Sequence, residues 1–89
     1  MYYSIPKDTL ASRDQGEFVL MNMETGKFYG LDSTGSEIWA LLEEGMSISA
    51  ISDQLCIRYP QVSQERALAD ISGLINQLLQ AKLIQEKPR

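Results

Sequence analysis

The sequence contains no histidine and only one cysteine, and these two absences remove most catalytic and metal chemistry. Without histidine there is no imidazole general base, no Ser-His or Cys-His pair and no histidine-containing metal site. A single cysteine excludes an intrachain disulfide and a cysteine cluster for zinc or iron–sulfur. No glycine spacing typical of a phosphate-binding loop is present. We therefore expect a protein that is not an enzyme and that holds no cofactor or metal.

Positive charge and long apolar runs are also scarce. Eight basic residues stand against twelve acidic ones, which gives a net charge of −4. Binding to nucleic acid depends on clustered Lys and Arg, so this balance argues against a nucleic-acid partner. No run of about eighteen apolar residues is present, so we expect no membrane span and no membrane partner. We expect one small cytoplasmic domain over residues 1–89.

The first third of the sequence has the composition of β-strands. Residues 17–23 and 27–31 are rich in aromatic, β-branched and other apolar side chains. Glu24-Thr25-Gly26 joins them and is typical of a hairpin with a bulge-type turn. A weaker strand is expected between Ile5 and Ser12, with Asp14-Gln15-Gly16 as its turn into the next strand. These runs predict a three-stranded antiparallel sheet.

Three amphipathic helices are expected after the sheet. The N-cap candidates are Asp32, Ser33 or Thr34 for the first helix, Ser47 for the second and Ser63 for the third. Gly45 ends the first helix and Pro60 ends the second. Residues 83–85 form either a short terminal strand or an extended tail. The order of elements predicts an α+β domain of winged helix-turn-helix-like topology.

The apolar positions of the third helix cover an arc of about 140°, wider than one packed face requires. Two interpretations remain open. The helix is lodged between the other helices and the sheet, or one edge around Ala67, Ile71 and Leu74 lines an exposed groove for an apolar ligand. We expect Trp39 and Cys56 to be packing residues, since nothing in the sequence activates the thiol.

The series of motifs resembles the PqqD-like family. An apolar strand leads into Thr25-Gly26-Lys27-Phe28-Tyr29-Gly30-Leu31-Asp32 and then into Gly35 and Ile38-Trp39. Gly45-Met46-Ser47-Ile48 resembles the start of the family's second helix. Asp70-Ile71, Leu74-Ile75, Leu78 and Leu83-Ile84 resemble its third helix. The resemblance covers about residues 18–84, and one departure is Lys82, where the family usually has glycine.

This resemblance implies a peptide-recognition module. Such domains hold the leader segment of a ribosomally made precursor peptide and deliver it to a leader peptidase and to a cyclase or other modifying enzyme. The leader is held as an added strand on the third strand of the sheet, beside the third helix. Lasso-peptide biosynthesis is favoured. The alternatives are service to a radical-SAM enzyme, as in the pyrroloquinoline quinone pathway, or a winged-helix DNA-binding regulator, although neither candidate recognition helix carries a basic stripe.

The residues themselves agree with peptide binding by strand addition. The expected edge consists of Lys27, Phe28, Tyr29, Gly30 and Leu31, with Gly30 leaving room for another backbone. The expected helical wall consists of Ala67, Asp70, Ile71 and Leu74. Asp70 either receives a basic or hydroxyl group of the peptide or is a plain exposed carboxylate. An exposed edge also pairs with copies of itself, so both a monomer and a homodimer are compatible with the sequence.

Overall fold

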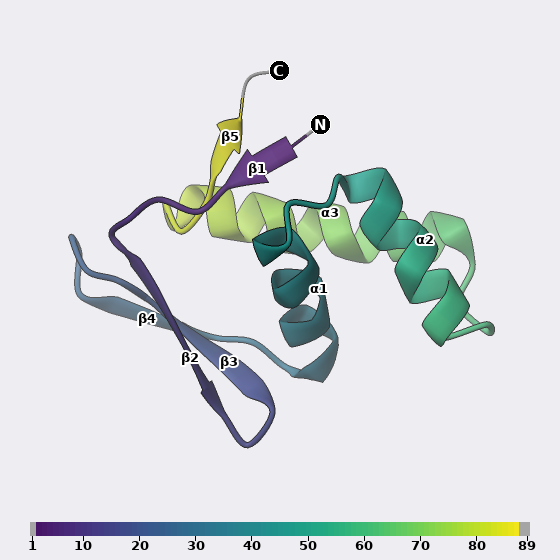
Figure 1. The fold of residues 1–89 in the computed structure, drawn as a ribbon, viewed down its shortest axis with the longest axis horizontal. Coiled ribbons are helices and arrows are strands. Elements are labelled where there is room, and N and C mark those ends of the chain that lie inside the picture. Colours follow the sequence, from purple (N-terminus) through teal and green to yellow (C-terminus); the bar gives the residue numbers. More distant parts are fainter. Residues whose placement is uncertain (1, 88–89) are drawn as a thin grey trace.

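The structure is a computed structural model that describes residues 2–87, so residue 1 and residues 88–89 of the expected domain lie outside it. Five strands and three helices follow one another along the described chain (Figure 1). In order they are β1 (Tyr2–Ser4), β2 (Thr9–Asp14), β3 (Glu17–Asn22), β4 (Lys27–Gly30), α1 (Ser33–Glu43), α2 (Ile48–Arg58), α3 (Gln64–Gln80) and β5 (Gln85–Lys87). The predicted α+β class, a three-stranded antiparallel sheet followed by three helices, is confirmed.

Two tight hairpins build the sheet, whose strand order is β2-β3-β4. Gln15 and Gly16 between β2 and β3 have φ values of 54° and 85°. Gly26 between β3 and β4 has a φ of 75°, and its N–H donates to the Asn22 carbonyl. Positive φ is the conformation that these turns require and that glycine adopts without steric cost. Both turns therefore form where the sequence predicts them.

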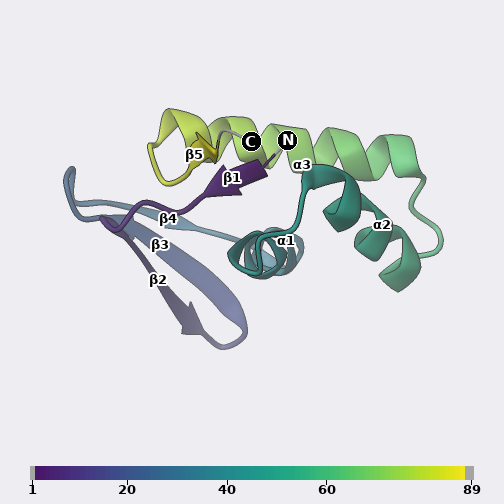
Figure 2. The same cartoon turned by 45° about the horizontal axis from the view of Figure 1, so that its top comes forward.

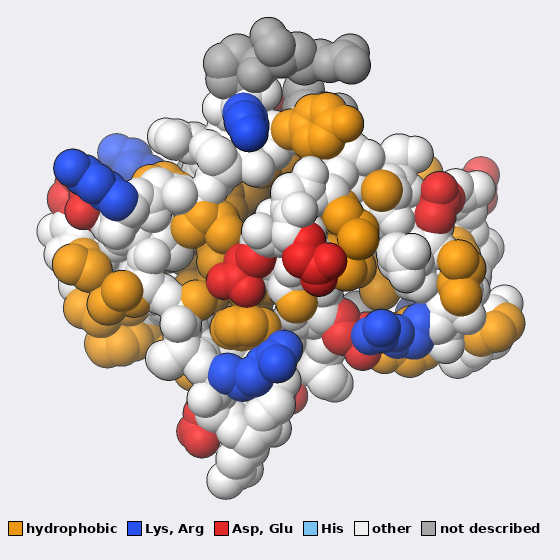
Figure 3. Space-filling view, in the orientation of Figure 1, with side chains coloured by type: hydrophobic (Ala, Val, Ile, Leu, Met, Phe, Trp, Pro, Cys, Tyr) orange, Lys and Arg blue, Asp and Glu red, His pale blue; other side chains and the backbone are white. Residues whose placement is uncertain are grey.

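The strand register divides the sheet into two faces. Tyr29 lies opposite the fully buried Leu20, so its side chain belongs to the inner face. Phe28 lies opposite Met21, which in turn lies opposite Leu10, so these three side chains form a row on the outer face. Phe28 is 69% exposed. Hydrophobic side chains gather over this end of the sheet in the space-filling view (Figure 3).

Each helix begins at a side-chain cap. The side-chain oxygens of Asp32, Ser47 and Ser63 accept hydrogen bonds from the N–H groups of the residues three positions later. Of the three candidates for α1, the structure selects Asp32. Gly45 follows α1 with a φ of 86°, as predicted, and Lys82 follows α3 with a φ of 58°. Lys82 therefore adopts the left-handed conformation that glycine would favour at this position.

The core lies where the three helices meet the inner face of the sheet. The Trp39 side chain on α1 is fully buried, which confirms its expected packing role. Ile51 of α2 and Ile71 and Leu78 of α3 are buried in the same cluster. In Figure 2 α3 extends along one side of the molecule, and α1 lies under its middle, next to one end of the sheet. This arrangement places the middle of α3 beside the first turn of α1.

The two ends of the chain form a second, two-stranded sheet that the sequence analysis missed. β1 pairs with β5 in antiparallel register, with Tyr3 opposite Glu86. A terminal strand was one of two expectations for residues 83–85, but the strand begins at Gln85, while Leu83 and Ile84 are buried in the core. No strand was expected at Tyr2–Ser4, because three residues carry too little periodicity to indicate one.

Candidate functional site

The free edge of β4 is the first part of the site. Among residues 2–87, β4 pairs only with β3. The Leu31 N–H donates to the Phe18 carbonyl at 2.9 Å, on the β3 side. Main-chain groups alternate sides along an antiparallel strand, so those of Gly30 and Phe28 point away from β3. Two residues of β4 therefore offer unpaired N–H and C=O groups to an incoming strand.

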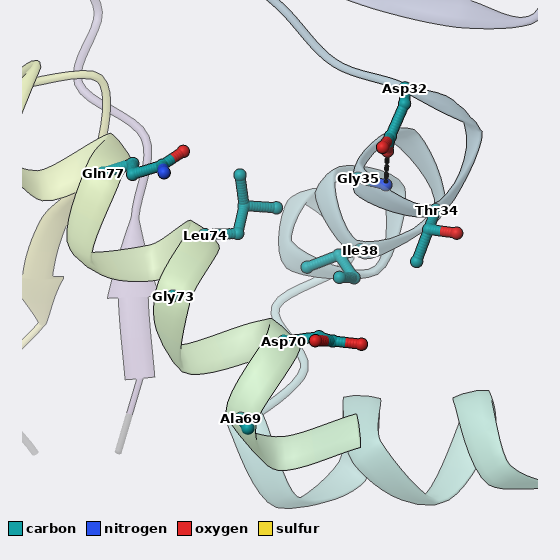
Figure 4. Close-up of a pocket in the computed structure, with 9 residues that line it drawn as sticks. All are labelled: Asp32, Thr34, Gly35, Ile38, Ala69, Asp70, Gly73, Leu74 and Gln77. Carbon is teal, nitrogen blue, oxygen red and sulfur yellow. Dashed lines mark hydrogen bonds between the residues drawn. The ribbon is translucent and has the colours of Figure 1, made fainter. Parts of the chain in front are cut away.

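A groove of about 480 Å³ lies between the first turn of α1 and the middle of α3 (Figure 4). From α3, the Leu74 and Gln77 side chains point toward α1, and Asp70 points into the same gap. From α1, Ile38 faces them, and Asp32 caps the helix by accepting from the Gly35 N–H at 2.8 Å. The lining of the groove includes the apolar side chains of Ile38 and Leu74 and the carboxylates of Asp32 and Asp70, which suits an amphipathic ligand.

A smaller hollow of about 240 Å³ lies at the opposite end of β4. Its lining includes Lys27, Phe28 and Tyr29 of β4 and residues 80–83 at the end of α3. Between the hollow and the groove, the Tyr29 hydroxyl donates a hydrogen bond to the Gln77 side-chain oxygen. This contact joins β4 to α3 across the space between them. We call the groove, the hollow and this contact together the β4–α3 cleft.

The structure brings together most, but not all, of the residues predicted for the site. Lys27, Phe28, Tyr29 and Gly30 form β4, and Asp70 and Leu74 line the groove. The remaining three predicted residues are buried: Leu31, Ala67 and Ile71.

The expectation that Ala67 and Ile71 belong to an exposed edge of α3 is wrong, since they are 1% and 0% exposed. Their side chains belong to the common core cluster, and α3 packs against α2 on this side. Ala67 also borders a different hollow, beside Tyr59 at the end of α2. The wall of the groove is the neighbouring stripe of α3, which carries Asp70, Leu74 and Gln77.

Several groove residues were missed by the sequence analysis: Asp32, Thr34, Gly35, Ile38, Ala69, Gly73 and Gln77. On α3, the members at positions 70, 73, 74 and 77 follow the spacing of one helical face. That spacing could have indicated a shared helical face. It was missed because the face mixes polar and small residues and therefore gives no hydrophobic pattern. On α1, the short connection could have indicated the site. Asp32 follows β4 almost directly, so the first turn of the helix must lie next to the strand.

The surroundings of Gly30 bear on its expected role at the free edge of β4. A Cβ added at this position would meet no atom within 4 Å. The register places Gly30 opposite Val19, so a side chain here would stand on the outer face of the sheet and not in the path of an added strand. The register thus gives no steric reason for glycine here, and the interpretation of Gly30 as room for another backbone stays a prediction. Its contribution to the site is its outward main-chain groups.

A polar cluster away from the cleft ties α1 to α2. The Tyr59 hydroxyl donates to the Glu37 carboxylate at 2.9 and 3.0 Å, and Arg58 forms a salt bridge with the same carboxylate at 3.3 Å. The hydrogen bond to Glu37 and, after it, partial burial raise the pKa of Tyr59 above its ordinary value. Cys56 on α2 is half-buried and packs against the core. These contacts are structural and leave the cleft as the candidate site.

Other classes of site find little support in the described part of the chain. Within residues 2–87 no three His, Cys, Asp or Glu side chains are grouped so as to hold a metal ion. No helix in this range has the length and apolarity needed to cross a bilayer. On the face seen in Figure 3, Lys and Arg side chains are dispersed among acidic ones and form no stripe.

Comparison with known proteins decides the family. The sequence model described as "Coenzyme PQQ synthesis protein D (PqqD)" matches residues 17–84. The chain belongs to the PqqD family. The match extends from the start of β3 to the residues just after α3, so it includes both walls of the cleft. The resemblance inferred from the sequence motifs is thereby confirmed.

Two solved structures resemble this PqqD-family chain over nearly its whole length. "TbiB1 in Complex with the TbiA(beta) Leader Peptide" is 30% identical, with a TM-score of 0.89, and the match covers 97% of this chain and 99% of that one. "Lasso peptide synthetase B1 complexed with the leader peptide" is 19% identical, with a TM-score of 0.85, and the match covers 97% and 100% of the two chains. Among curated proteins, none matches this PqqD-family chain.

Proposed function

We propose that this chain binds the leader segment of a ribosomally synthesised precursor peptide without catalysing any reaction on it. The leader adds as a strand to β4 and packs its inward side chains against α3. The observation that carries this proposal is the free edge of β4 lying directly beside the groove between α1 and α3. Strand addition provides main-chain hydrogen bonds, and adjoining pockets select side chains.

The biological setting follows from the neighbours. Both similar solved structures are complexes with leader peptides, and one of them is named "Lasso peptide synthetase B1". These names support a role in lasso-peptide biosynthesis, in which we expect a leader peptidase and a cyclase as further partners. The alternative is service to a radical-SAM modifying enzyme, which would use the same peptide-binding step. The neighbouring genes distinguish the two pathways: a short precursor gene together with a peptidase gene and a cyclase gene would identify the lasso pathway.

A titration monitored by amide NMR tests the proposal. The probe is the TbiA(beta) leader, the peptide named in the 30% identical structure. We expect the largest shifts at Phe28 and Gly30 on β4 and at Asp70 and Leu74 on α3, with saturation at a one-to-one ratio. A scrambled peptide of the same composition is the control. Shifts confined to α2, or equal binding of the scrambled peptide, would contradict the proposed site.

The same free edge allows a second copy of the chain to compete for β4. In that case leader binding and self-association exclude one another. Sedimentation with and without the leader distinguishes the two states, because a homodimer paired through β4 dissociates as the leader binds.

A further inference from the structure

The two ends of the β4–α3 cleft carry side chains of opposite charge. Asp70 and Asp32 lie at the groove end, and no basic residue lines that groove. Lys27 and Lys82 lie at the hollow end, and no acidic residue lines that hollow. Within residues 2–87, none of these four side chains takes part in a salt bridge. Their charges are therefore available to a ligand that lies along the cleft.

Local structure accounts for two of the four charges. Asp32 caps α1, where a carboxylate complements the positive end of the helix dipole. Lys82 lies just beyond the C-terminus of α3, where a cation complements the negative end. Asp70 lies in the middle of α3, and Lys27 lies at the first position of β4, so neither serves a helix end. Local structure therefore does not account for the charges of Asp70 and Lys27.

The register of β4 sets the spacing that a bound strand would sense. Side chains of an added strand that lie opposite Leu31, Tyr29 and Lys27 share the inner face of the sheet. The position opposite Tyr29 meets the contact between Tyr29 and Gln77. The positions on either side of it reach the groove and the hollow respectively. Since alternate residues share a face, these two positions are four residues apart.

We infer that the cleft selects an extended peptide segment with a basic side chain at the Asp70 end and an acidic side chain at the Lys27 end, four residues apart. This inference rests on the proposed strand addition at β4 and specifies the chemistry of the peptide that binds there. The position between the two charges is occupied by a small residue, because the Tyr29–Gln77 contact fills the space on that side. Addition antiparallel to β4, the direction of both strand pairs in this sheet, places the basic residue first in the peptide and the acidic residue four positions later.

A library of random twelve-residue peptides displayed on phage, selected on the folded chain at low salt, tests this inference. The variant Asp70→Lys/Lys27→Glu exchanges the two charges and leaves the net charge unchanged. The control Glu43→Lys/Lys7→Glu makes the same kind of exchange at exposed positions outside the cleft. We expect the wild-type chain and the control to enrich one order of basic and acidic residues, and the exchanged variant to enrich the reverse order.

Synthetic peptides then give the size of the effect. Interchanging the two charged residues of an enriched peptide is expected to weaken its binding to the wild-type chain about tenfold at low salt, and less as salt is added. Asp70→Asn/Lys27→Gln should abolish the preference without reversing it. Enrichment with no charge order, or with the same order on both proteins, overturns the inference while strand addition stands. Failure to enrich any peptide overturns the proposed function together with the inference.

Discussion

The two edges of the β2-β3-β4 sheet differ in what lies beside them. Within residues 2–87, β2 and β4 each pair only with β3, so both edges have outward main-chain groups. Beside β4, Leu74 and Gln77 of α3 form a wall at the groove. Beside β2, Leu10 to Asp14 are exposed, and Arg13 turns back over the Phe18 ring at 4.5 Å from its centroid.

This difference shows why one edge is a candidate binding site and the other is not. A main-chain hydrogen bond made in water contributes only about 0.5–1.5 kcal/mol net, and ordering a peptide offsets much of that. A strand added to β2 would gain hydrogen bonds but bury few side chains. A strand added to β4 would also bury its inner side chains against α3. The helix would therefore make strand addition at the β4 edge selective.

The largest expected effect is on the core that supports both edges. Replacing the buried side chain in Trp39→Ala should lower the free energy of unfolding by about 3–5 kcal/mol, a large part of a small domain's stability. Thermal denaturation followed by circular dichroism measures the loss. Any loss of leader binding should follow the unfolded fraction. A folded Trp39→Ala protein that fails to bind would place Trp39 in the site.

Proline substitutions compare the two edges directly. Gly30→Pro removes an outward N–H of β4 and places the proline ring toward an added strand, while the N–H groups of Tyr29 and Leu31 that face β3 remain. Leader binding measured by fluorescence anisotropy should weaken about a hundredfold or more, which corresponds to about 2.7 kcal/mol.

The matched control for Gly30→Pro is Ala11→Pro on the opposite edge. Val19 lies opposite Ser12 in the register, and the alternation of main-chain groups turns those of Ala11 away from β3. Ala11→Pro should leave leader affinity unchanged. Gly30→Ala, which keeps the N–H, should also bind normally because a Cβ there meets open space. Equal losses from both proline variants would remove the distinction between the edges.

Local signals in the sequence explain why so much of the fold could be predicted. Gly26 and Gly45 mark turns that need positive φ, and Ser47 and Ser63 mark helix starts, since each acts within a few residues. The pairing of β1 with β5 could not be predicted, because it joins opposite ends of the chain and depends on the finished core.

The site was harder to predict than the fold, because it depends on how α3 is rotated about its axis. Neighbouring positions on a helix differ by about 100°, so Asp70 faces the groove while Ile71 faces the core. The apolar pattern identified α3 as amphipathic but did not show which partner each part of the wide arc contacts. That assignment requires the positions of α1 and the sheet.

Leu74 tests whether the helical wall gives the β4 edge its affinity. Leu74→Asp places a charge where an apolar side chain of the leader would dock, and should weaken binding by about 2 kcal/mol, roughly thirtyfold. Leu68→Asp makes the same change at an exposed position of α3 that lies outside the groove, and should leave binding unchanged. Equal effects of the two variants, both folded by circular dichroism, would show that the groove is not the docking wall.

The smallest expected effect concerns Lys82, which lies at the hollow end of the cleft and also ends α3. Its N–H donates to the Leu79 carbonyl, and the Leu83 N–H donates to the Leu78 carbonyl, the same pattern that Gly45 and Met46 make after α1. Because a left-handed conformation costs lysine more than glycine, Lys82→Gly should raise the free energy of unfolding by about 0.5–1 kcal/mol. Gly45→Lys, the reverse change at the matching position, should lower it by a similar amount.

Binding separates this structural effect from the role of Lys82 in the cleft. Removing one exposed charge changes an interaction by at most about 1 kcal/mol, so Lys82→Gly should weaken leader binding no more than about fivefold. That loss is far smaller than the loss expected for Gly30→Pro, although both residues border the same cleft. If Lys82→Gly lowers the melting temperature instead, the left-handed end of α3 does not form in solution. If it abolishes binding in a folded protein, the cleft depends more on charge than on the β4 edge.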